Sequence, residues 1–198
     1  MRTQTFHLVE PVGPVDHVLG PDHAPVTLVE YGDFECPHCK QASGSVKLLL
    51  ARHEQQVRFA FRHYPLEGVH PHAQYAALAA ECAAAQGRFW PMHDLLFANQ
   101  QHLEPAHIAG YARTLGLDMA RFQAEMDDEI YLQRVREHQR SGDASGVRAT
   151  PTFYVNGDLV DVSYGLQRLM EAVDALIVVP APDRGTRRNP GLPSRRDE

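Results

Sequence analysis

The chain is 198 residues long, with 43% hydrophobic and 22% charged residues, and its formal net charge is −6 at pH 7. This composition is that of an ordinary globular protein, and it excludes collagen-like, low-complexity and disulfide-stapled small proteins. An acidic chain is also poorly suited to bind the phosphate backbone, so we expect no nucleic-acid partner.

The sequence shows no sign of membrane insertion or export. No run reaches the roughly 18 apolar residues of a membrane span, and residues 1–10 lack the apolar stretch of a secretory signal. We therefore expect a cytoplasmic protein without a membrane partner, or an exported one if a leader has been removed. We also expect a monomer, because no apolar stripe remains after the predicted core is assigned.

The first predicted elements form a β-α-β unit. Residues 1–15 are predicted to be an irregular arm, and residues 16–19 a short edge strand. Residues 25–31 are β-rich and mostly apolar, which is typical of a strand buried on both faces. A helix pattern follows over 37–53, and residues 57–62 alternate apolar and basic side chains like a half-buried strand.

The middle of the chain changes to helical patterns throughout. The predicted helices cover residues 73–86, 89–99, 105–116, 119–126 and 129–139. Gly87 is a typical signal for a helix end, and Asp118 is a typical helix N-cap. Residues 141–146 are rich in Ser and Gly, so we predict a loop there.

Strand character returns after that loop. Residues 152–155 form a predicted strand, Asn156-Gly157 is a strong hairpin-turn signal, and residues 159–162 form the returning strand. Residues 166–177 have helical periodicity. The last residues, 179–198, are rich in Pro, Gly and Arg without periodicity, and we predict that they are disordered.

This order predicts an α/β fold in which a helical insertion interrupts one sheet. Neither β piece is large enough to bury a core alone. We therefore predict one domain from residues 16–62 and 147–178, an inserted helical domain over 63–146, and the arm and tail at the two ends.

The motif that carries chemistry is Cys36-Pro37-His38-Cys39, which follows the buried strand and opens a helix. Two cysteines three residues apart on a first helical turn lie on one face, close enough to form a disulfide. The helix N-terminus favours a thiolate there. We predict that Cys36, with an exposed sulfur, attacks or is attacked, and that Cys39 resolves the mixed disulfide.

Neighbouring residues are predicted to tune this pair. Pro37 suits the first helical position, where its missing N–H would be unpaired in any case. His38 can add a positive charge or an N–H donor near the Cys36 sulfur. Glu35 and Asp33 would raise the pKa of Cys36 instead, and the sequence leaves open which effect prevails.

The same motif admits other interpretations. A CxxC can be half of a zinc site, which needs about four ligands. A soft-metal-binding or metallochaperone module would use the same two thiols, and a chaperone-like groove would need no redox chemistry. We assign no metal ligands, because most of the remaining candidates are expected to pack or cap helices: His63, His70, His72, His93 and the apolar-face Cys82.

Two more positions are candidate substrate contacts. A proline that enters a strand, as Pro151 does, removes a hydrogen-bond donor from the ladder. A cis bond there would leave the Thr150 backbone free to pair with a substrate chain, and an ordinary trans proline is the alternative. Phe34 either lines a groove near Cys36 or belongs to the core.

Residues 30–39, EYGDFECPHC, resemble the active-site segment of the DsbA-like thioredoxin-fold dithiol–disulfide oxidoreductases. Residues 61–66 with 70–73, residues 87–90 with 92–97, and residues 146–157 resemble further segments of that family in the same order, and the match covers about residues 16–178. The resemblance implies a thioredoxin fold with an inserted helical domain. It also implies that Cys36 is the nucleophile, Cys39 the resolving cysteine and Pro151 a cis-proline.

The function implied is that of an oxidoreductase and isomerase of protein disulfides, with protein thiols and disulfides as substrates. No cofactor is expected, because the exchanged electrons stay on the two sulfurs. A redox-recycling partner, or glutathione, would restore the pair. The direction of electron flow is left open by the sequence.

Overall fold

The computed structural model describes residues 6–177, which form a mixed α/β fold. The strands are β1 (His17–Leu19), β2 (Val26–Gly32), β3 (Val57–His63), β4 (Thr152–Val155) and β5 (Asp158–Val160). The helices are α1 (Pro37–Arg52), α2 (Ala73–Ala84), α3 (Phe89–Ala98), α4 (Pro105–Thr114), α5 (Met119–Asp127), α6 (Leu132–Ser145) and α7 (Gln167–Leu176).

The strands form one sheet in the order β1-β3-β2-β4-β5. Strands β2 and β3 are parallel, and every other pairing is antiparallel. The central strand β2 is buried at every position except Thr27, as its apolar sequence predicts. Leu28 on β2 pairs with Phe59 on one side and Val155 on the other, which fixes the register at the centre of the sheet.

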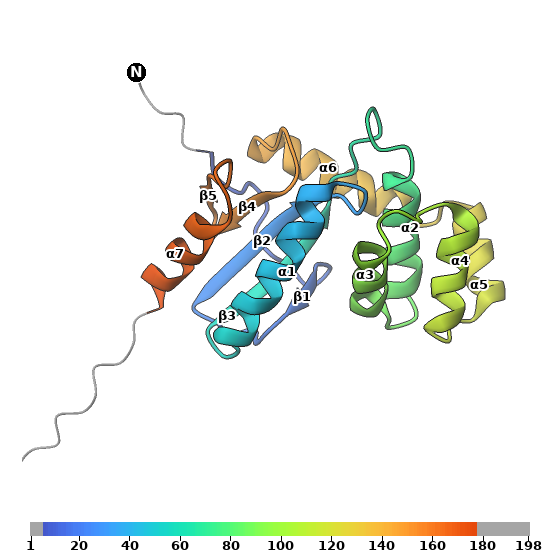
Figure 1. Cartoon of the computed structure of the whole chain (residues 1–198), viewed down its shortest axis with the longest axis horizontal. Coiled ribbons are helices and arrows are strands. Elements are labelled where there is room, and N and C mark those ends of the chain that lie inside the picture. Colours follow the sequence, from blue (N-terminus) through green and yellow to red (C-terminus); the bar gives the residue numbers. More distant parts are fainter. Residues whose placement is uncertain (1–5, 178–198) are drawn as a thin grey trace, which may run out of the picture.

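Helices cover both faces of the sheet. Helices α1 and α7 lie on one face, where Leu49 and Val173 share a core with Leu28 (Figure 1). Helix α6 lies on the other face, where the Ser141 hydroxyl is hydrogen-bonded to Tyr31 of β2. Residues that alternate along β2 therefore enter two different cores, which explains why this strand is apolar on both faces.

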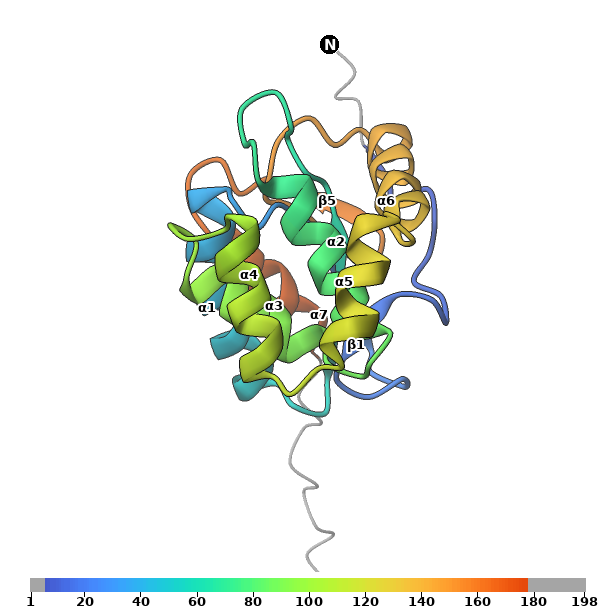
Figure 2. The same ribbon diagram turned by 90° about the vertical axis from the view of Figure 1, so that its right-hand side faces the viewer.

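The remaining helices, α2 to α5, pack side by side next to the sheet, and Figure 2 shows this block face on. Helix α2 is at its centre and contacts α3, α4, α5 and α6. Its alanines are buried along almost the whole helix, which lets the neighbouring helices approach closely. The predicted order of a β-α-β unit, a helical block and a β-β-α unit is confirmed.

Helix α6 differs from the prediction. It continues to Ser145, whereas the sequence predicted a loop over 141–146. Position 142, inside this helix, has room only for glycine. A Cβ atom added there would lie 2.9 Å from the Tyr64 ring, which is too close. The helix ends at Gly146, whose φ of 91° is the left-handed conformation typical of a helix end. Although the predicted domain boundaries place α6 in the insert, it packs on the sheet.

Residues 6–8 of the N-terminal arm contact the sheet. His7 forms a β-bridge with Asp158, and the Leu8 N–H donates to the Gly157 carbonyl at 2.8 Å. The predicted disorder of residues 179–198 concerns residues outside the described range. Among the described residues, no helix combines the length and the apolar character needed to span a bilayer.

Candidate active site

The two motif cysteines lie at the start of α1, directly beyond the end of the buried strand β2. Cys36 is the N-cap residue, with φ −74° and ψ 120°, and Pro37 is the first residue of the helix. No side chain within residues 6–177 caps this end of the helix. The backbone N–H groups of the first turn are therefore available to the Cys36 sulfur.

Several donors favour the thiolate form of Cys36. The hydrogen bond from the Cys39 thiol has the largest effect and, with the Thr150 side chain and the backbone N–H groups of Cys39 and His38, lowers the Cys36 pKa to about 5. These effects outweigh burial, which acts in the opposite direction. The side chains that the sequence set against each other, His38 on one side and Glu35 and Asp33 on the other, are not among these leading causes.

The pKa of Cys39 is shifted in the opposite direction from that of Cys36. It is fully buried, and burial raises the pKa of its thiol well above the usual value of 9.0. The Asp33 backbone N–H donates to its sulfur at 3.4 Å. At neutral pH the structure therefore holds a thiolate at Cys36 beside a protonated thiol at Cys39, the asymmetry that thiol–disulfide exchange uses.

The expectation of an exposed Cys36 sulfur is wrong for this form of the protein, since only 4% of the residue is accessible. The segment before β4 covers it, and the Cys36 sulfur lies 3.3 Å from the Thr150 carbonyl oxygen, to which it donates only when it is protonated. The peptide bond between Thr150 and Pro151 is cis. The Thr150 hydroxyl is buried and has no hydrogen-bond partner among the described residues, so it is free to donate to the thiolate.

A groove of about 680 Å³ borders the cysteines on the side of β5 and α7. It brings together three of the predicted site residues, His38, Thr150 and Pro151. Its remaining walls come from α1, β5 and the segment before α7: Gln41, Ser45, Leu159, Val160, Val162 and Leu166 among others. The exposed His38 side chain stands at the helix end of this groove.

Two predicted residues are placed differently from expectation. Phe34 is 1% exposed and packs against Phe61 and Phe97, with ring centroids 5.2 and 5.0 Å away, so it belongs to the core and is not a groove residue. Glu35 accepts a hydrogen bond from the His72 backbone N–H at 2.6 Å. Its carboxylate is thus bound to the helical side of the site, and the Cys36 pKa is low despite its charge.

Sequence reasoning missed Glu30, which lies on β2 beneath the cysteines. It is 1% exposed, and its Oε1 has no hydrogen-bond partner among the described residues. Burial and the nearby Cys36 thiolate raise its pKa to about 8, so it holds a proton at neutral pH. The sequence does offer a sign of this residue. Glu30 is a carboxylate in a mostly apolar strand, two residues after Leu28 and therefore on the same, core-facing side of the strand.

The helical block holds the active-site loop from the other side. The buried Asp33 carboxylate accepts from the Leu66 N–H at 2.9 Å and pairs with His70 at 2.7 Å. The Gln100 amide donates to the carbonyls of Phe34 and Cys36, both at 2.8 Å. The position of Cys36 therefore depends on residues far along the chain, which no local pattern could indicate.

Comparison with known proteins places this geometry in a family. The model of the Thioredoxin family matches residues 13–175. Two curated relatives carry the name Na(+)/H(+) antiporter NhaA: that of Salinispora arenicola is 50% identical over 167 residues, and that of Herminiimonas arsenicoxydans is 45% identical over 181. These matches cover 84% and 91% of this chain, but only 26% and 28% of the relatives. The chain thus spans about a quarter of their length.

Solved structures give the same assignment. Oxidised BdbD from Bacillus subtilis superposes with a TM-score of 0.73 at 26% identity, covering 81% of this chain and 92% of that one. A thioredoxin-like oxidoreductase from Silicibacter pomeroyi has a TM-score of 0.73 at 28% identity, with 82% and 92% covered. Wolbachia pipientis α-DsbA2, at 20% identity and a TM-score of 0.71 over 82% and 88%, shares the fold. The chain therefore belongs to the thioredoxin family, as a DsbA-like member with helices inserted into the fold.

Proposed function

We propose that the chain is a protein dithiol–disulfide oxidoreductase that works through Cys36 and Cys39. The observation that carries this proposal is the unequal pair of sulfurs, a Cys36 with a pKa of about 5 over a buried Cys39 whose pKa is raised. A low-pKa sulfur is a good leaving group and nucleophile in disulfide exchange once the Thr150 segment that covers it gives way to a substrate, whereas a neighbour with a raised pKa is suited to resolution. The oxidoreductase named among the solved structures supports the same chemistry.

In the oxidising direction, a substrate thiolate attacks the Cys36 sulfur of the disulfide form. The Cys36–Cys39 bond breaks, a mixed disulfide forms at Cys36, and Cys39 takes up a proton. A second substrate thiolate then attacks the substrate sulfur of the mixed disulfide and releases Cys36 as a thiolate. The substrate loses two electrons and the pair gains them.

Glu30 is suited to handle the proton of Cys39. Its carboxyl group lies beneath the pair, and its charge is among the causes that raise the Cys39 pKa. A cavity of about 60 Å³ lies beside it, lined partly by Ser43, Lys47 and Asp94. A carboxyl group with a pKa of about 8 can give or accept a proton near neutral pH, as a general acid or base must.

The low pKa of Cys36 also favours one direction. It stabilises the reduced protein, which makes the disulfide form an oxidant. The cytosolic glutathione pool would keep such a pair reduced. The sequence predicts a cytoplasmic protein. To act there as an oxidant, the protein would need a recycling partner that is more oxidising than glutathione.

The groove beside Pro151 is the proposed contact for protein substrates. Its apolar residues, including Leu159 and Val160, suit an extended peptide whose cysteine reaches Cys36. The antiporter name of the curated relatives is not transferred, because three quarters of those proteins have no counterpart in this chain.

The decisive experiment measures the reduction potential of the Cys36–Cys39 pair in glutathione buffers, with free thiols quantified by alkylation. A value between about −120 and −180 mV is expected for an oxidant. Cys36→Ser should abolish oxidation of a reduced peptide, Cys39→Ser should accumulate the mixed disulfide, and Cys82→Ser is the matched control with unchanged activity. A pair that never forms a disulfide would contradict the proposal and favour metal binding by the two thiols.

A further inference from the structure

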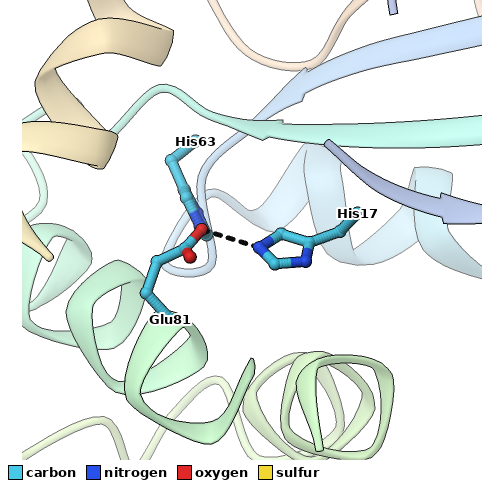
Figure 3. Close-up of side chains that lie close together, drawn as sticks. All are labelled: His17, His63 and Glu81. Carbon is cyan, nitrogen blue, oxygen red and sulfur yellow. Dashed lines mark hydrogen bonds and ion pairs between the residues drawn. The ribbon is translucent and has the colours of Figure 1, made fainter. Parts of the chain in front are cut away.

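A second cluster of reactive side chains lies where the helical block meets the sheet (Figure 3). His17 of β1, His63 at the end of β3 and Glu81 of α2 point toward one another. The Nε2 atoms of His17 and His63 lie 2.8 and 2.9 Å from the same Glu81 oxygen, Oε1. Three elements that are distant in sequence thus supply two imidazoles and one carboxylate to a single point.

The two imidazole rings are held in place by their neighbours. His17 stacks on Phe89 with a centroid distance of 3.5 Å and an interplanar angle of 13°. His63 contacts the rings of Phe61 and Phe89 and stacks against His138. The orientation of each Nε2 is therefore fixed by packing, so little ordering would be needed to bind a ligand at this point.

The cluster contains the carboxylate of Glu81, whose negative charge a bound cation would neutralise. Glu81 is 4% exposed. Its Oε1 accepts the hydrogen bonds of both His17 and His63. The nearest buried guanidinium, that of Arg62, is already paired with Asp16 at 2.8 Å.

An imidazole balances a buried carboxylate only when it is protonated, whereas a divalent cation does so with neutral imidazoles. Two imidazole nitrogens with one carboxylate oxygen are a known ligand set for Zn²⁺ and neighbouring first-row ions. Ligands about 2.0–2.2 Å from a tetrahedral ion lie roughly 3.3 Å apart. The donors would therefore need to separate by only about half an ångström.

We propose that His17, His63 and Glu81 form a binding site for a divalent ion of the Zn²⁺ class. The ion replaces the two imidazole protons that now face Glu81 Oε1, and it leaves further coordination positions to water. Because the ligands come from β1, β3 and α2, the bound ion fastens the helical block to the sheet. This role is structural and independent of the thiol chemistry proposed above.

The test uses the full-length chain with Cys36→Ser and Cys39→Ser, so that the motif thiols cannot bind the ion. Zn²⁺ is titrated by calorimetry, and bound metal is counted after dialysis. We expect one bound Zn²⁺ per chain, a higher melting temperature with Zn²⁺, and at least a ten-fold loss of affinity in His17→Gln and Glu81→Gln. Because the thiols are absent, the outcome does not depend on whether the redox proposal is correct.

The matched control removes an exposed cluster of the same composition, His102, Glu104 and His107. His102→Gln combined with His107→Gln should leave the affinity unchanged. If Glu81→Gln fails to fold, His17→Gln decides, because His17 lies on a short outer strand and is partly exposed. Absence of Zn²⁺ binding, or binding that is lost in the control and kept in His17→Gln, would overturn the proposal.

Discussion

Two buried carboxylates, Glu30 and Glu81, show how partners decide the behaviour of a charged group. Both are almost fully inaccessible, at 1% and 4% exposure. Glu30 has an unpaired oxygen and a pKa raised to about 8, whereas Glu81 accepts from two histidines and its pKa is lowered. Burial alone would raise the pKa of both.

The difference assigns distinct roles to the two positions. Glu30 is a destabilised group beneath the reacting sulfurs, and it can exchange a proton near neutral pH. Glu81 is a permanent anion that joins the sheet to the helical block. Titratable groups with strongly shifted pKa values and missing hydrogen bonds are common at functional sites, whereas fully hydrogen-bonded groups stabilise the fold.

The largest expected effect is at Glu81. Glu81→Gln leaves the buried His63 and the partly exposed His17 without their anion, and removal of one partner from a buried pair costs about 3–5 kcal/mol. We expect a loss of unfolding free energy of about that size in urea denaturation. Glu54→Ala, which removes an exposed carboxylate, should change stability by less than about 0.5 kcal/mol. A small effect at Glu81 would remove the distinction drawn between the two carboxylates.

The next effect is a pH dependence that differs between redox forms. The Glu30 pKa is raised from 4.5 to about 8, so its contribution to stability is complete below pH 4.5 and is lost as the pH rises through 8. The Cys36 pKa is lowered from 9.0 to about 5, so its contribution is complete above pH 9 and is lost as the pH falls through 5. Between pH 5 and 8 the two slopes oppose each other in the reduced protein.

In the disulfide form Cys36 cannot titrate, and only the Glu30 slope remains. We expect the oxidised protein to lose at most about 2.7 kcal/mol between pH 5.5 and 7.5, at 1.36 kcal/mol per unit. In the reduced protein the contributions of Glu30 and Cys36 cancel, and in the oxidised Glu30→Gln variant both groups are absent. The free energy of unfolding of these two samples should therefore change little between the two pH values. Urea denaturation of the three samples at both pH values measures this, and equal slopes in both redox forms would contradict the assignment.

A smaller, kinetic effect is expected at the same carboxyl. Glu30→Gln removes the group that can exchange a proton with Cys39, so attack of Cys39 on a mixed disulfide should slow about ten-fold or more near pH 7. Stopped-flow measurement with a fluorescent peptide disulfide gives this rate. Glu35→Gln is the matched control, and an equal slowing in both variants would argue against a specific role for Glu30.

The smallest effect is expected at Glu35 itself. Its carboxylate is bound to the His72 N–H, so Glu35→Gln should lower the Cys36 pKa by less than about half a unit. Thiolate absorbance near 240 nm, measured against pH, reports the value. A shift of a full unit or more would restore the tuning role that the sequence predicts for Glu35.

Local patterns were enough to predict much of this molecule. The strands and most helices follow from the periodicity of their own residues, and the spacing of Cys36 and Cys39 at a helix start predicts the reactive pair. The extension of α6 could not be predicted, because the local pattern of Ser and Gly indicates a loop, and the Tyr64 ring that leaves room only for glycine at position 142 comes from a distant part of the sequence.

The contacts around the site were the least predictable part. The Gln100 amide donates to the carbonyl of Cys36, which is 64 residues away in the sequence. His17 and Glu81, which are hydrogen-bonded, have the same sequence separation. Phe34 was a poor candidate for substrate contact, because aromatic residues beside a motif more often pack inward. Glu30 was visible in the sequence, but its meaning depends on the burial that only the fold provides.

The contact of residues 6–8 with the sheet has a consequence for assembly. Strand β5 is the edge of the sheet, and an open edge is a template on which another chain can add a strand. Phe6 packs over Gly146 while His7 bridges Asp158, so the arm occupies part of this edge. Residues 6–8 thus act as a guard against aggregation through sheet extension, and a tag or fusion partner placed at this end should leave them undisturbed.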